Sequence, residues 1–250
     1  SYHPDKHPGY TALDLPFLPL PDFDTQWAVH DAFHAHPHVQ QELAKWNAMP
    51  YSSNLLPQYE FIGKGKQPKS LADFKGMRVR AIGGIGDAMR NLGAVPTSVP
   101  ATEVYTSIER GTVDAASFPS TYAHASYKIH EIGSWYTSNM SPGTQACPTL
   151  IHKGAWAQLP PQYKKLVEEI RPRVKDALVA AYRAADEKNL PLFKRRLAFI
   201  TYTAAELAEF RKVGAQPVWE KWTAEMAAKG VPAKELLDLI AQSAAQAQKK

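Results

Sequence analysis

The sequence predicts an α/β protein, and three observations lead to this fold class. First, short segments with many β-branched residues alternate with helical segments from Tyr59 onward. Second, a long helical run opens at Pro160-Pro161. Third, a chain of 250 residues with 44% hydrophobic and 21% charged residues is ordinary for a globular protein and can bury a sizeable core.

The N-terminal part of the chain is predicted to be irregular at first and then helical. Residues 1–24 are rich in proline, with Leu15 and Phe17 among their apolar anchors. Residues 25–46 are predicted to form a helix, or a helix pair interrupted before Pro37, because proline disfavours a helical residue in front of it.

The middle of the chain is predicted to alternate between strands and short helices. The expected strands are residues 59–62, 78–82, 95–99, 113–118, 134–139 and 145–152, with another at 197–203. The expected helices between them are residues 87–92, 102–110 and 121–130. Gly83, Gly84 and Gly86 are predicted to form a turn between strand 78–82 and the helix that follows.

The last third of the chain is predicted to be mainly helical. A long helix should run from Pro160 to about Asn189, with one apolar stripe because Leu166, Ile170, Val174 and Leu178 repeat at every fourth position. Thr203 and Glu206 form a predicted capping box that opens the C-terminal helices.

Composition excludes several classes of protein. The net charge of +5 comes from 29 basic and 24 acidic residues that are scattered along the chain, which does not indicate a nucleic-acid surface. No apolar run is long enough to span a membrane, and the first residues do not read as a secretory leader, so we expect any leader to be absent from this sequence. The single cysteine, Cys147, excludes an internal disulfide and is expected to be a small buried residue.

The Gly83–Gly86 turn suggests one function, that of a nucleotide-dependent α/β enzyme. Glycine-rich turns between a strand and a helix can hold a pyrophosphate. However, Met89 stands where the dinucleotide fingerprint needs a small residue, and Asp87 would repel a phosphate at the helix start. The nucleotide reading stays open as an alternative.

The histidine-rich segment His30–His38 suggests a second alternative, a metal-binding protein. His30 and His34 are four residues apart and would lie on one helix face, where two imidazoles can share a metal ion. The segment lacks a downstream ligand at zinc spacing, and its apolar residues interleave as they do on an amphipathic helix.

Arg80 is the strongest candidate for a binding residue. It lies two residues before the glycine-rich turn, near the carboxyl end of a predicted strand, where open α/β sheets hold ligands. A guanidinium group can bind a carboxylate through two parallel hydrogen bonds. The residue pattern therefore indicates an anchor for an organic acid, with a surface ion pair as the simpler alternative.

Several motifs resemble those of one family of receptors. Residues 71–80, LADFKGMRVR, resemble the signature DLKGLKIR of the solute-binding proteins of TRAP transporters, the DctP-like family. The likeness continues, in the family's order, through YHP at 2–4, LPF at 15–17, LGAVP at 92–96, EVY at 103–105, GTVD at 111–114, FP at 118–119 and WAQLP at 156–160.

The resemblance implies a periplasmic receptor that has no enzymatic activity and no cofactor. Such receptors capture small organic acids between two α/β lobes, joined by crossing strands and a long helix, and pass them to the membrane subunits of a sodium-coupled transporter. The expected lobes are residues 1–57 with 144–185 and residues 58–143 with 186–215, and residues 216–250 would be helices packed on them. Arg80 matches the family's carboxylate-binding arginine. No nucleic-acid binding and no membrane insertion are implied.

Three departures from the family pattern bear on the ligand. The βαβ segment that normally opens the family's fold is expected to be missing, because this chain starts after it. Ser117 and Phe118 stand where relatives carry a metal-binding Glu or an Asn, so no metal is expected, and Phe118 could form an apolar or aromatic wall. A second arginine of the sialic-acid receptors has no match near Tyr59. We therefore expect a monocarboxylate, with Ser117, Phe118, Tyr59, Gln145 and Tyr2 as further candidate contacts.

Overall fold

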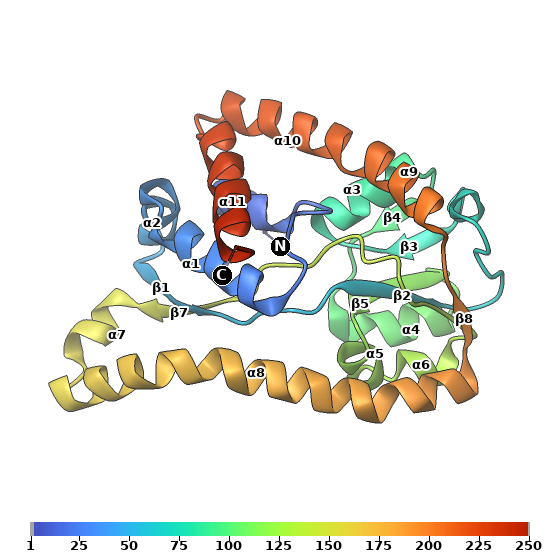
Figure 1. The fold of residues 1–250 in the computed structure, drawn as a ribbon, viewed down its shortest axis with the longest axis horizontal. Coiled ribbons are helices and arrows are strands. Elements are labelled where there is room, and N and C mark those ends of the chain that lie inside the picture. The colour runs from blue at the N-terminus through green and yellow to red at the C-terminus, as the bar shows by residue number, and fades with distance from the viewer. Residues whose placement is uncertain (1–2, 250) are drawn as a thin grey trace.

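The computed structural model describes residues 3–249, and its elements fall into two groups joined by crossing segments and one long helix (Figure 1). Tyr2 lies outside the described residues, so its predicted role in ligand binding remains a prediction.

The first group holds a small two-stranded sheet. Strands β1 (Ala48–Ser53) and β7 (Pro148–His152) pair antiparallel, from Ala48 with His152 to Ser53 with Pro148. The surrounding elements are η1 (Gly9–Asp14), α1 (Phe23–Ala35), α2 (Pro37–Ala44), α7 (Lys153–Gln158), α10 (Gln216–Ala228) and α11 (Ala233–Ala247). A core that includes Leu13, Phe33 and Leu236 holds α1, η1 and α11 together.

The second group is built on a mixed six-stranded sheet with the order β4-β3-β5-β2-β6-β8. The strands are β2 (Tyr59–Gly63), β3 (Arg78–Arg80), β4 (Val95–Thr97), β5 (Ala115–Pro119), β6 (Trp135–Thr137) and β8 (Ala198–Ile200). β2 pairs antiparallel with β5 and β6, whereas β3 is parallel to β4 and β5, and β6 is parallel to β8.

Helices cover both faces of this sheet (Figure 1). On one face lie α3 (Gly83–Asn91) and α9 (Ala204–Gly214), which bury Ile85 and Phe210 against Val79 and Trp135. The short helix η2 (Leu71–Phe74) adds Leu71 and Phe74 to the same core. On the other face lie α4 (Val104–Glu109), α5 (Tyr122–Ser126) and α6 (Ile129–Ile132), and η3 (Ala101–Glu103) directly precedes α4.

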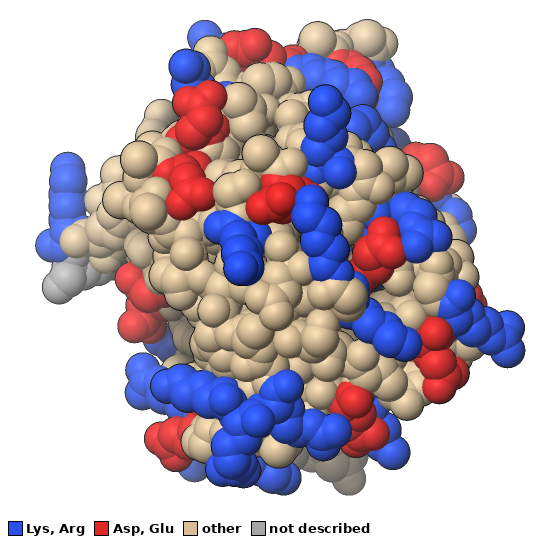
Figure 2. All heavy atoms as spheres, turned by 90° about the vertical axis from the view of Figure 1, so that its right-hand side faces the viewer, with Lys and Arg blue, Asp and Glu red and all other residues tan. Residues whose placement is uncertain are grey.

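Helix α8 (Pro161–Arg196) runs along both groups at the bottom of Figure 1, which confirms the predicted long helix and extends it beyond Asn189. Its predicted apolar stripe is wrong in its first half, because Leu166 and Ile170 are 49% and 40% exposed. The helix ends in Lys194, Arg195 and Arg196, and cations are favoured at a helix C-terminus. In Figure 2, Lys and Arg are most numerous along the lower edge, at the height of this helix, and Asp and Glu lie among them there and on the rest of the face.

Three further predictions, on two element boundaries and on the burial of Cys147, can be compared with the structure. The break before Pro37 is confirmed, since α1 ends at Ala35 and α2 begins at Pro37. The glycines at 83–86 do not form a separate turn as predicted, because α3 already begins at Gly83. Cys147 is exposed rather than buried, because it lies on the segment that leads into β7 and not within a core.

Candidate functional site

The guanidinium of Arg80 lies at the end of β3, where that strand runs parallel to its neighbours β4 and β5. The side chain is only 1% exposed. Its Nε donates to the carbonyl oxygen of Val99 at 3.0 Å, and one terminal nitrogen donates to the carbonyl oxygen of Ser117 at 2.9 Å. These two hydrogen bonds, to carbonyl groups of two neighbouring segments, hold the Arg80 guanidinium in one orientation at the C-terminal end of β3.

The ring of Phe118 packs against the Arg80 guanidinium. Cζ of Arg80 lies 4.6 Å from the centre of the Phe118 ring, a distance at which a ring face attracts a cation. Tyr127 stacks on Phe118 with ring centres 5.2 Å apart, and His124 meets the same ring edge-on at 5.5 Å. The structure thus brings together Arg80 and Phe118, two residues that sequence reasoning proposed for ligand binding.

Ser117 contacts Arg80 through both its backbone carbonyl and its hydroxyl. Successive side chains in a strand point to opposite faces, so Ser117 and Phe118 cannot line the same face of β5. The Ser117 hydroxyl donates to the carbonyl oxygen of Arg80 at 3.2 Å, while its own carbonyl accepts from the Arg80 guanidinium. This reciprocal pair fixes the end of β3 against β5.

Tyr59 and Gln145 are buried near the segments that connect the two groups. Tyr59 is 4% exposed and packs in the core between the sheet and α3. Gln145 is 4% exposed, and its amide nitrogen donates to the carbonyl oxygen of Thr144. Its amide oxygen would lie 3.2 Å from a Cβ placed on Gly83, so Gln145 sits beside the first residue of α3.

The glycines of α3 serve close packing within the protein. A Cβ on Gly84 would lie 2.5 Å from Cδ of Pro16 and 2.6 Å from the carbonyl oxygen of Asp14, and one on Gly86 would lie 2.8 Å from the carbonyl oxygen of Ala81. These distances are too short for any side chain. The contacts explain the glycines without a bound nucleotide.

The histidine segment packs into the first group. Nδ1 of His30 bonds to the Ser53 hydroxyl, and Nε2 of His34 bonds to the Tyr10 hydroxyl at 2.6 Å. Burial lowers the pKa of His30 to about 3 and that of His34 to about 4, so both rings are neutral at pH 7. Among residues 3–249, no three His, Cys, Asp or Glu side chains are placed to hold a metal ion together.

Glu60 is a residue that sequence reasoning missed. Its carboxylate is buried in β2 and accepts from the Thr137 hydroxyl, from the backbone N–H of Met140 and from both the N–H and the hydroxyl of Ser141. Burial raises the pKa of Glu60 to about 7, although these four donors favour the ionised form. The one feature of the sequence that could have indicated a buried carboxylate here is an acidic residue within the apolar segment YEFI at 59–62.

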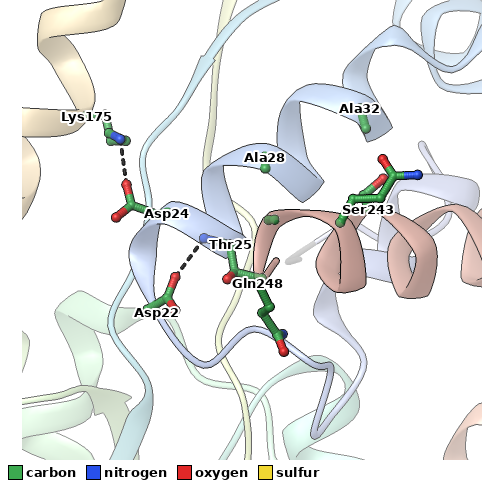
Figure 3. Close-up of a pocket in the computed structure, with 10 residues that line it drawn as sticks. Asp22, Asp24, Thr25, Ala28, Ala32, Lys175, Ser243 and Gln248 are labelled. Carbon is green, nitrogen blue, oxygen red and sulfur yellow. Dashed lines mark hydrogen bonds and ion pairs between the residues drawn. The ribbon is translucent and has the colours of Figure 1, made fainter. Parts of the chain in front are cut away.

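Two cavities of the protein bear on where a ligand could bind. One of about 570 Å³ is lined by Asp14, Gly83 and Ser98 among others, and so reaches the start of α3 and the residue before Val99. Another of about 610 Å³ lies between α1, α8 and α11 (Figure 3). There Asp24 points to Lys175 at 2.6 Å, and Asp22 accepts from the backbone N–H of Thr25. Arg80 and Phe118 line neither cavity.

The protein consists of two units, each with a sheet and helices, that are joined by crossing segments and one long helix. This arrangement places it in the class of two-unit α/β folds. The chain belongs to the bacterial extracellular solute-binding protein family 7, the DctP family, whose model matches residues 2–226. This confirms the resemblance that the motifs indicated.

Solved structures of low sequence identity share the fold. A TRAP solute-binding protein from Rhodoferax ferrireducens, in complex with copurified benzoate, is 22% identical with a TM-score of 0.79, and the match covers 99% of this chain and 77% of that one. A second, from Desulfovibrio salexigens with bound orotic acid, is 19% identical with a TM-score of 0.86 over 99% and 78% of the chains.

Among curated proteins, a monocarboxylate 2-oxoacid-binding periplasmic protein of Nostoc is 29% identical over 103 residues, or 40% of this chain. The matched stretch spans 28% of that relative. Within the part of the chain that the structure describes, no helix has the length and apolar character needed to cross a bilayer.

Proposed function

We propose that this protein is the solute-binding receptor of a TRAP transporter, located in the periplasm. It captures a small organic acid and delivers it to the membrane subunits for sodium-coupled uptake. The observation that carries the proposal is the fixed guanidinium of Arg80 at the parallel end of β3, held by two carbonyl oxygens and the Phe118 ring. Membership in the solute-binding family supports it.

The ligand would bind between two lobes. We assign residues 1–57 with 144–185 to one lobe and residues 58–143 with 186–215 to the other, with residues 216–250 packed on them. Arg80 would take the carboxylate, and closure of the lobes would remove water from the pair and so strengthen it. Benzoate, orotic acid and malonate occur in solved structures of the same fold, which supports an organic acid as the ligand.

Replacement of Arg80 by lysine tests the anchor, and Arg78 offers a matched control on the same strand. Arg80→Lys keeps the charge but loses the planar fork, so affinity for a carboxylate should fall about ten- to a hundredfold, as expected when a charge-assisted hydrogen bond is lost. Arg78 is half exposed and pairs with Asp114 at 2.5 Å, so Arg78→Lys should leave affinity unchanged.

The measurement is isothermal titration with the carboxylates that raise the melting temperature of the unmodified protein. Circular dichroism of both variants checks that they fold. Equal affinities of a folded Arg80→Lys variant and the unmodified protein would refute the anchor.

A further inference from the structure

We propose that Glu60 is a proton-dependent clamp on the connection between the two groups. In its ionised form the carboxylate holds the backbone of Met140 and Ser141, where the chain leaves β6 toward β7, and a proton on the carboxylate releases this segment. The clamp is a property of the chain itself, whereas its effect on ligand binding rests on the proposed function.

Glu60 lies where the two crossing segments run beside each other. It is the second residue of β2, which the chain enters from the first group, and it is 3% exposed. One carboxylate oxygen accepts from the N–H of Met140 at 3.2 Å. The other accepts from the N–H of Ser141 at 2.9 Å and from its hydroxyl at 3.2 Å. A single carboxylate thus joins the incoming strand to the outgoing backbone.

The held segment has a backbone conformation that needs this support. Ser141 has a φ of 40°, in the left-handed region that residues other than glycine seldom adopt. Two residues further, the carbonyl oxygen of Gly143 accepts from the N–H of Tyr59 at 2.9 Å. When the bonds from Glu60 are lost, Ser141 is free to return to a commoner conformation, and the change acts directly on the segment that crosses between the groups.

Every partner of the carboxylate donates a hydrogen bond to it. Besides Met140 and Ser141, the Thr137 hydroxyl donates to the carboxylate while it accepts from the N–H of Phe61. In a protonated carboxyl one oxygen becomes a donor. An O–H directed at backbone N–H groups finds no acceptor there, so the proton and the clamp oppose each other.

No cation compensates the charge of Glu60. Within residues 3–249, no Lys, Arg or His side chain forms an ion pair with this carboxylate. Burial is the larger effect and raises the pKa of Glu60 to about 7, while the hydrogen-bond donors lower it. Release of Met140 and Ser141 would remove three of these donors while β2 stays between β5 and β6, so the pKa would rise further. Protonation therefore favours release.

The titratable groups around Glu60 keep their charge near neutral pH. His124 of α5 donates to the backbone carbonyl of Glu60 and stays neutral, because burial lowers its pKa to about 3. Burial raises the pKa of Tyr136 on β6 and of Tyr202 after β8, and the charge of Glu60 adds to both shifts. Arg80, whose charge acts on His124, stays protonated. Among these groups, Glu60 is the one that changes charge between pH 8 and 6.

Amide hydrogen exchange measures the clamp without a ligand. The peptide that spans residues 138–146 is followed by mass spectrometry at pH 6, 7 and 8. Its exchange is expressed as protection factors, which remove the ordinary effect of pH on the exchange rate. Protection should fall about three- to tenfold from pH 8 to pH 6, because one unit of pH changes the ratio of ionised to protonated Glu60 tenfold.

Three variants identify the group that takes up the proton. Glu60→Gln should give low protection that no longer depends on pH. Glu42→Gln alters an equally buried acid within the first group and should leave the pH dependence intact. Ser141→Ala removes one donor and should move the midpoint of the change to a higher pH, a shift that a merely structural role would not produce. Circular dichroism confirms folding, and Ser141→Ala keeps the clamp testable if Glu60→Gln is unstable.

Calorimetric titration shows whether the clamp governs ligand binding. Benzoate and orotate, which both stay ionised in this range, are titrated at pH 6 and pH 8. Affinity should fall by up to about tenfold at pH 6, because the fraction of receptor with an ionised Glu60 falls by that factor. Glu60→Gln should bind equally at both pH values.

Each result decides a separate point. Protection that stays constant with pH, that rises toward pH 6, or whose pH dependence survives Glu60→Gln would overturn the clamp. Equal affinity at both pH values, with pH-dependent protection, would overturn its control of binding. Failure of every carboxylate to bind would overturn the proposed function, and hydrogen exchange alone would then decide the clamp.

Discussion

His124 shows how a single buried side chain is held in one protonation state. Its Nε2 donates to the backbone carbonyl oxygen of Glu60 at 3.0 Å, so Nδ1 carries the lone pair. Nδ1 is buried and has no hydrogen-bond partner within the described residues. Burial lowers the pKa of His124 to about 3, and the nearby charge of Arg80 acts in the same direction. The neutral ring can therefore pack against Phe118 without competing with Arg80 for the proposed carboxylate ligand.

The lowered pKa of His124 predicts a dependence of stability on pH. Because the unfolded chain takes up a proton near pH 6.5 and the folded chain does so only near pH 3, stability is lost as the pH falls through this window. His124→Gln, which can still donate to Glu60, should reduce the slope of unfolding free energy against pH by about 1.4 kcal/mol per unit between pH 6 and 4. Urea unfolding at several pH values measures it, and parallel curves for the two proteins would contradict it.

At the scale of elements, the start of α3 depends on glycines because another segment approaches it closely. Gly84→Ala should place a methyl group against Pro16 and the carbonyl oxygen of Asp14, and overpacking of this kind costs about 1–3 kcal/mol. Gly154 is the matched control, since it is also the second residue of a helix, α7, and its new Cβ would meet side chains rather than backbone: the ring of exposed His152 and, at 3.9 Å, the amide nitrogen of Asn47. Gly154→Ala should change stability by less than about 1 kcal/mol. Chemical denaturation compares the two, and similar effects would argue against the contact.

Elements whose signals are local could be predicted from the sequence, and those made by distant pairing could not. The long helix has its own start signal at Pro160-Pro161 and was predicted. Strand β1 was missed because MPYSS has no β-branched residue, and it forms by pairing with β7 about a hundred residues later. The start of α3 was misplaced because glycine usually indicates a turn, although a first helical turn needs few internal bonds.

In the candidate site, too, local features could be predicted from the sequence and contacts between distant segments could not. Arg80 was predictable because its place at a strand end is local information. Its support by Phe118 was not, since that contact requires the register in which Arg80 lies opposite Ala116 of β5.

At the scale of the whole molecule, two antiparallel segments connect the groups, and hydrogen bonds tie them together. Asn54 donates to Cys147, Thr144 donates to Leu56, and Tyr59 donates to Gly143, each at 2.8–2.9 Å. Glu60 adds the bonds to Met140 and Ser141 at one end of this ladder. Ser141 has a left-handed backbone with φ of 40°, a conformation that needs such support. A change at Glu60 should therefore alter the relative motion of the two groups.

Glu60→Gln tests this role, because an amide can satisfy only part of the four donors that the carboxylate accepts. We expect the free energy of unfolding to fall by about 1–3 kcal/mol, since a buried donor that loses its acceptor costs about that much. Carboxylate affinity should fall as well, because in the proposed closure of the lobes a looser connection would have to be ordered.

Glu42 separates the two effects. It is equally buried and also accepts two backbone N–H groups, from Gly9 and Tyr10, but it lies within one group. Glu42→Gln should lower stability, measured by urea unfolding, and leave the calorimetric affinity for a carboxylate unchanged. If both variants lowered affinity equally, or neither did, Glu60 would be an ordinary buried acid with no role in the proposed closure.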